Sequence, residues 1–150
     1  MQGIHLQAAL LCERVIHEKD GTLSVSRIID TLRHVAPTLE PFAYTMTALV
    51  ILRSDETQVT VPLKIEMETP EGLPAHSMNM DVPMKGKGQN VVVNMQLVFK
   101  EPGLHLFNIY IDSQLAAKIP FMVIYVRKGG DTPDRLKLTD FVRGEIISPQ

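Results

Sequence analysis

Apolar and polar residues alternate strictly along residues 58–68. The apolar residues at every second position of this segment are Val59, Val61, Leu63, Ile65 and Met67. A period of two places them on one face of a β-strand, whereas a helix would scatter them around its circumference. Pro62 lies at one of the intervening positions and cannot donate a ladder hydrogen bond. We therefore expect this strand to lie at a sheet edge or to carry a bulge.

The same alternation recurs along most of the chain. Six further segments show it: residues 4–12, 23–26, 42–52, 91–99, 107–111 and 117–125. In the first of these, the predicted core face carries Ile4, Leu6, Ala8, Leu10 and Cys12. The breaks between the segments hold Gly, Pro, Asp and Ser, which favour turns, and Asp20-Gly21 is a strong short-range hairpin signal. The pattern thus predicts strands and turns from residue 4 to residue 125.

Two stretches depart from this pattern. Residues 69–90 are rich in proline and glycine, and we interpret them as a long loop that contains one short strand at residues 77–84. Residues 128–150 begin with Lys-Gly-Gly-Asp-Thr-Pro, which is typical of a boundary. We therefore divide the chain into a domain of residues 1–127 and a C-terminal tail of residues 128–150.

The predicted strands must bury their apolar faces against something. A second sheet does this most simply when no helix is predicted between the strands. The sequence therefore predicts an all-β fold, an antiparallel two-sheet sandwich with the layout of immunoglobulin or C2 domains, followed by a C-terminal extension.

The composition limits which partners and which cellular compartment we expect for the protein. The 15 Lys and Arg residues and 17 Asp and Glu residues give a net charge of −2, so charge alone attracts neither nucleic acid nor an anionic membrane. The longest apolar stretch is too short to cross a bilayer, and the first residues lack the features of a secretory signal. A single cysteine cannot form an internal disulfide, which suits a reducing compartment. We expect a cytoplasmic protein with no nucleic-acid or membrane partner.

Cys12 is the one candidate for a thiol nucleophile. Such a residue needs a nearby base or cation that lowers the pKa of its thiol. Its place in the predicted core face favours an inert, buried cysteine instead, because free cysteine is among the most buried residue types.

The cluster His76, Met78 and Met80 is the most distinctive candidate site. Alternate positions on a strand place the three side chains on one side, and imidazole and thioether groups suit copper(I). Methionine also fills gaps in cores and contact surfaces, and we favour that interpretation here. We therefore predict no metal and no cofactor, and keep these three residues as the metal-binding alternative.

The tail offers a candidate for partner binding. Phe141, Ile146 and Ile147 make it more apolar than a free tail requires. Docking as an added strand or as a short amphipathic helix would bury them. The sequence leaves open whether the tail docks on its own sandwich or on another protein.

Residues 8–32 and 101–123 together carry a recognisable set of motifs. The opening strand contains Leu11-Cys12 and runs through a Gly turn to Ile29-Asp30, and the closing strand follows Pro102-Gly103 and returns after a short turn. This combination resembles a family of uncharacterised bacterial proteins of unknown function. His105 stands where the closing strand of that family has an aromatic residue. The resemblance implies a small β-sandwich and brings no catalytic or binding residue.

The functional prediction is a non-enzymatic interaction or structural module that binds a protein partner or associates with itself. We find no Ser/His/Asp arrangement whose spacing suggests chemistry. One alternative is a ligand or copper(I) module that uses residues 76–84, and another is a subunit of a larger bacterial or phage assembly. The third is an enzyme with a site on the long loop, in which Cys12 or His76 takes part.

Overall fold

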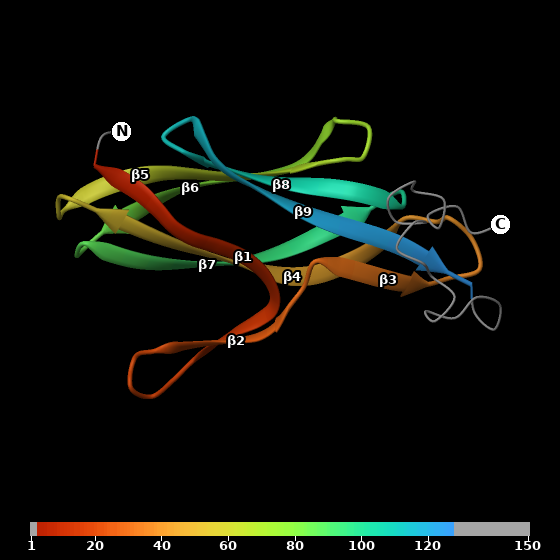
Figure 1. Ribbon diagram of the computed structural model, residues 1–150, viewed down its shortest axis with the longest axis horizontal. Helices are drawn as coiled ribbons and strands as arrows, with labels where there is room; N and C mark the ends of the chain where they lie inside the picture. The colour runs from red at the N-terminus through yellow and green to blue at the C-terminus, as the bar shows by residue number, and fades with distance from the viewer. Residues whose placement is uncertain (1–2, 128–150) are drawn as a thin grey trace.

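The computed structural model describes residues 3–127, which form a sandwich of two β-sheets (Figure 1). The strands are β1 (Ile4–His17), β2 (Leu23–Ile28), β3 (Thr31–Val35), β4 (Phe42–Ser54), β5 (Val59–Glu68), β6 (Pro74–Met84), β7 (Gly88–Phe99), β8 (Gly103–Ile111) and β9 (Gln114–Val126). One sheet has the order β2-β1-β4-β7 and the other the order β3-β9-β8-β5-β6. No helix occurs within the described residues.

The all-β sandwich predicted from the alternation is therefore confirmed, and each predicted strand is present. Pairing is antiparallel except at one edge, where β3 runs parallel to β9. The sequence analysis missed β3 and this parallel pair, because Thr31–Val35 is short and carries Arg33 and His34 among its apolar residues. The β1–β2 hairpin extends away from the two layers at the lower left of Figure 1.

The predicted loop at residues 69–90 is wrong. A tight turn closes where the Thr69 N–H donates to the Leu73 carbonyl at 2.8 Å, and β6 and β7 fill most of the remaining stretch. The prolines that suggested a loop, Pro74 and Pro83, occupy exposed positions on an edge strand, where a missing N–H is tolerated.

The prediction that the strand containing Pro62 lies at a sheet edge or carries a bulge there is also wrong, because its register with β6 shifts only between Met67 and Glu68. β5 lies between β6 and β8, and Val61 and Ile65 are both 0% exposed in the core as their alternation predicted. Pro62 is accommodated because the β8 ladder ends beside it. The Pro62 carbonyl accepts from the Asp112 N–H at 2.9 Å, in the turn after β8, so the proline nitrogen faces that turn.

A β-bulge changes the faces of β1. The register with β4 shifts between Leu6 and Ala8, so Ala9 and Leu11 face the core after the bulge. The predicted core face of this strand is therefore wrong beyond residue 7. Cys12 points to the other face, where it is nevertheless 0% exposed beside its strand neighbour Thr47.

A chain of aromatic rings runs through the core at one end of the sandwich. His34 stacks on Phe42 at 3.7 Å between ring centroids, and Phe42 packs against Phe99 at 5.6 Å. Phe99 also contacts Phe121 at 5.7 Å and the edge of His105 at 5.1 Å. These contacts connect strands of both sheets, so Phe99 is the central ring of this cluster and links the two layers.

Replacing Phe99 with alanine removes this central ring. Phe99 is 0% exposed, so we expect Phe99→Ala to lower the free energy of unfolding by about 3–5 kcal/mol. Urea denaturation followed by circular dichroism measures this change. Gln96→Ala, at an exposed position of the same strand, is the control and should change stability by less than about 0.5 kcal/mol. Equal midpoints for the two variants would contradict the assignment.

Two histidines make the core sensitive to acid. Burial lowers the pKa of His34, and burial also lowers the pKa of His105, although a hydrogen bond to the Gly103 carbonyl opposes it. The unfolded chain therefore binds more protons than the folded one below the ordinary pKa of about 6.5. Stability is complete above that pH and falls as the pH drops through this range.

His105→Phe should reduce the acid sensitivity, because it keeps an aromatic ring against Phe99 and removes one titrating group. The measurement is the urea midpoint at a series of pH values from neutral to mildly acidic. An acid slope that is as steep in His105→Phe as in the natural protein would show that this imidazole does not contribute.

Candidate functional site

The edge strands β6 and β7 meet along one side of the sandwich. β6 ends the five-stranded sheet and β7 ends the four-stranded one. His76 links them, because its Nε2 accepts a hydrogen bond from the backbone N–H of Val98 at 3.2 Å. The side chain of one edge strand thus satisfies a backbone donor of the other.

A cavity of about 580 Å³ opens beside this link, and we call it the edge pocket. Its lining residues come from β5, β6, β7 and β8 and from the turns at the same end: Met67, Thr69, Glu71, Leu73, Pro74, Ala75, His76, Val98, Lys100, Glu101 and His105. Leu73 is 57% exposed and Val98 is 39% exposed, so two large apolar side chains face water here. The pocket is mixed in character, with an apolar part and charged groups.

The ionisable groups of the edge pocket influence one another. Burial raises the pKa of the Glu101 carboxyl, and the charge of Glu71 raises it further. His105 lies deeper, at 1% exposure, and its Nδ1 is 3.0 Å from the Gly103 carbonyl oxygen. The His105 ring therefore packs against Phe99, and one of its nitrogens is engaged with the Gly103 carbonyl at the start of β8.

The three residues singled out as a copper(I) alternative do share one side of β6, as alternation predicted. Met78 and Met80 are half-buried and pack against the core, and the Nε2 of His76 accepts a hydrogen bond from the Val98 N–H. Within residues 3–127, no three His, Cys, Asp or Glu side chains come together in a way that could hold a metal ion. In this arrangement the two methionines pack against the core, and His76 joins the two sheets.

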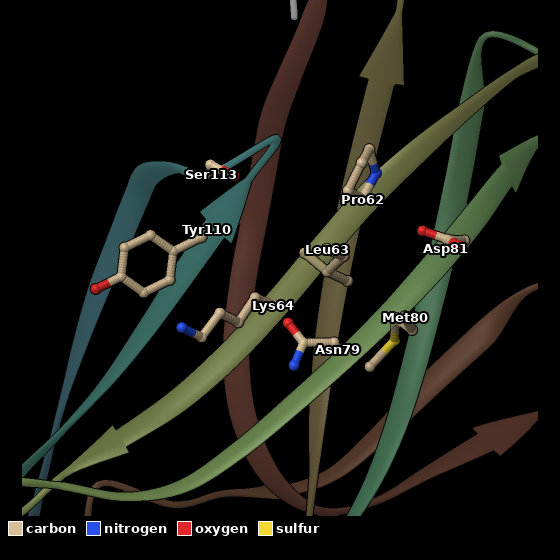
Figure 2. Close-up of a pocket in the computed structure, with 8 residues that line it drawn as sticks. All are labelled: Pro62, Leu63, Lys64, Asn79, Met80, Asp81, Tyr110 and Ser113. Carbon is tan, nitrogen blue, oxygen red and sulfur yellow. The ribbon is translucent and has the colours of Figure 1, made fainter.

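A second, shallower depression lies on the outer face of the five-stranded sheet (Figure 2). It has a volume of about 370 Å³, and we call it the outer basin. Pro62 and Lys64 come from β5, Asn79 and Asp81 from β6, and Tyr110 from β8, with Ser113 in the turn that follows. The sequence analysis missed it, because its residues look like an ordinary solvated face in each strand taken alone.

Cys12 has the properties of an inert thiol. It is 0% exposed, and burial raises the pKa of its thiol, opposed by a weaker hydrogen bond from the Arg14 backbone. A raised pKa leaves little thiolate, which is the reactive form.

A thiol reagent should therefore label Cys12 only when the protein unfolds. Cys12→Ser combined with Ser24→Cys is the control, because Ser24 is exposed on β2 and a cysteine there should react at once. Labelling is followed spectroscopically at neutral pH with and without denaturant. Rapid labelling of Cys12 in the folded protein would contradict its burial.

The tail residues Phe141, Ile146 and Ile147 lie outside the described residues. Among the described residues, no helix is long and apolar enough to cross a membrane.

These features define a small β-sandwich domain with a pocket at one edge and a basin on one outer face. The chain belongs to a family of unknown function (DUF6941), whose model matches residues 7–124. The resemblance derived from the strand and turn motifs is thus confirmed. His105, which departs from the aromatic residue of those motifs, is buried and packs against the Phe99 ring. No curated protein matches the chain.

Solved structures share the fold at low sequence identity. The Pseudomonas fluorescens alkylpurine DNA glycosylase AlkC, bound to DNA with an abasic site analog, has a TM-score of 0.53 and 8% identity over 82% of this chain. The present chain spans only 31% of the glycosylase. The C-terminal domain of wzt has a TM-score of 0.52 and 13% identity, covering 89% of this chain and 78% of that one.

An immunoglobulin-like protein from Pseudomonas aeruginosa is also similar. It has a TM-score of 0.42 and 12% identity, and the match covers 80% of this chain and 95% of that one. At such identities the first two likenesses concern the fold alone.

Proposed function

We propose that this domain is a non-enzymatic protein-binding module that takes an extended segment of a partner as an added strand along β7. In this mode, backbone hydrogen bonds supply affinity, and pockets beside the edge supply specificity. The two requirements are an open strand edge and a neighbouring pocket, and both occur on the side where β6 and β7 meet.

The observation that carries the proposal is the unprotected edge of β7. Natural proteins blunt exposed edges with charge, proline or short length. β6 carries Pro74, Asp81 and Pro83, whereas β2 and β3 have only 6 and 5 residues. β7 has 12 residues without a charge or a proline, and within residues 3–127 it pairs with β4 alone.

The register shows which backbone groups of β7 are open. Pairing with β4 continues without a shift from Phe99 to Gly88, so successive residues face alternately toward β4 and away from it. The Val98 N–H faces away, since it donates to His76. By the same alternation, the backbone groups of Asn90, Val92, Asn94 and Gln96 also face away from β4, and an incoming strand would bind there.

The edge pocket begins where this open stretch ends. The Val98 N–H already donates to His76, so an added strand would stop pairing with β7 near Gln96. The partner residues beyond that point would reach Leu73 and Val98 in the edge pocket. These two exposed apolar side chains favour a partner that presents an aliphatic or aromatic side chain at its end. Lys100 and Glu71 at the rim favour flanking charges of both signs.

The burial and hydrogen bonds of the potentially reactive side chains support the non-enzymatic part of the proposal. The Cys12 thiol is buried with a raised pKa, and His76 and His105 are engaged with backbone groups. A cytoplasmic location and a bacterial origin stay predictions of the sequence.

A peptide selection tests the added strand. Twelve-residue peptides displayed on phage are selected against the natural protein, and we expect recovered peptides to alternate apolar and polar residues. Gln96→Pro removes one outward donor and places a ring where the partner would lie, so it should weaken binding about 10-fold or more. Gln96→Ala keeps the N–H and should bind normally.

Amide hydrogen exchange supplies the second measurement. Bound peptide should slow exchange at Asn90, Val92, Asn94 and Gln96 while leaving the exposed β6 edge unchanged. Failure to recover alternating peptides, or equal binding to Gln96→Pro and Gln96→Ala, would overturn the proposal. Light scattering of the natural protein alone shows whether a second copy of the chain fills this edge instead.

A further inference from the structure

We infer that the outer basin on the five-stranded sheet binds a neutral, polyhydroxylated ligand such as a sugar residue of a glycan. The basin lies on the outer face of the sheet, whereas β7 is the edge of the other sheet, so this site is independent of the proposed strand addition. The two could be occupied together or separately.

The basin combines an apolar floor with tall polar walls. Register places Tyr110, Lys64 and Asn79 in one row across β8, β5 and β6, and pairs Pro62 with Asp81 in the next row. The compact ring of Pro62 supplies the apolar part of the basin, and Figure 2 shows it on the strand that also carries Lys64. A ring-shaped ligand can rest on this floor and against the side of Tyr110.

The walls offer donors and acceptors of complementary kinds. Lys64 supplies N–H donors, Asp81 supplies carboxylate acceptors, and Asn79 and Ser113 supply both. In the described part of the chain, no hydrogen bond or ion pair engages the side chains of Asn79, Asp81 or Ser113. Vicinal hydroxyl groups match such a mixture, because each hydroxyl both donates and accepts.

The charges disfavour an anionic ligand. Asp81 opposes an anion such as phosphate, and Glu66 offsets the charge of Lys64. Lys64 is also held in place, because its Nζ lies 3.2 Å from Glu66 Oε2 and 5.3 Å from the centre of the Tyr110 ring. An ammonium group held beside an aromatic ring can donate hydrogen bonds in a fixed direction and so orient a neutral polar ligand.

The backbone around the basin is specialised in two places. The β8–β9 register shifts beside Tyr110, where β9 carries the extra residue Ala116, whereas Tyr110 keeps its register with Lys64 of β5. Asp112 and Ser113 both have positive φ, at 49° and 67°, in a two-residue hairpin turn that normally favours glycine. A serine kept in this strained conformation places a hydroxyl at the basin rim, and strain of this kind gathers at binding sites.

A titration with neutral trisaccharides tests the inference. Malto-, cello-, xylo- and mannotriose are added at millimolar concentration while backbone amide signals are followed by NMR. We expect at least one of them to shift the amides of residues 62–64, 79–81 and 110–113. Inorganic phosphate and calcium ions are parallel probes, and a stronger response to either would show that the assigned ligand class is wrong.

Variants separate binding from folding. Tyr110→Ala and Asp81→Ala should each weaken binding about 10-fold. Lys118→Ala is the control, because Lys118 is exposed on β9 and takes no part in lining the basin. Ser113→Gly is the sharpest variant, because glycine relieves the turn strain and should raise the urea midpoint, whereas loss of the hydroxyl should weaken binding.

Two results would overturn the inference. One is the absence of a response at the basin amides to all four trisaccharides. The other is binding that is unchanged in Tyr110→Ala, or in Ser113→Gly when that variant is more stable. Neither result would bear on strand addition at β7, whose test uses another surface and other variants.

Discussion

Burial of alternate side chains between two sheets is the constraint on which the rest of this structure depends. Each strand can place only every second residue in the core, and each buried aliphatic or aromatic side chain contributes about 1.5–3 kcal/mol relative to its exposed form. With no tryptophan in the chain, the phenylalanines around Phe99 supply the largest buried rings. Chemistry that serves function is therefore confined to edges, turns and outer faces.

This constraint explains which features could be predicted from the sequence. Val61 and Ile65 lie in strict alternation, so their face was predictable, and the same holds for β4 and β7. The face of Cys12 was not predictable, because a single extra residue between Leu6 and Ala8 reverses the parity of everything after it. No local signal marks that residue as the one left over.

The prolines caused the other wrong predictions of strands and loops. The energetic cost of a proline in a strand depends on whether its nitrogen faces a neighbouring strand. Pro62 lies in an interior strand, at the position where the neighbouring ladder ends, and Pro74 and Pro83 lie on a sheet edge. The candidate sites escaped prediction for a related reason. Leu73 and Val98 line the same edge pocket, and Lys64 lies against Tyr110 in the outer basin, and both arrangements require knowledge of strand order.

Histidine takes different roles in this domain according to which surface it reaches. His105 replaces an aromatic ring in the core, where its buried nitrogen needs the Gly103 carbonyl. His76 instead reaches between the sheets and satisfies Val98, which protects one end of an otherwise open strand. That single hydrogen bond engages only the Val98 N–H, so under the proposed strand addition an added strand would stop there, beside the edge pocket. The side chain that joins the two sheets at this edge would therefore also set the boundary of the proposed binding surface.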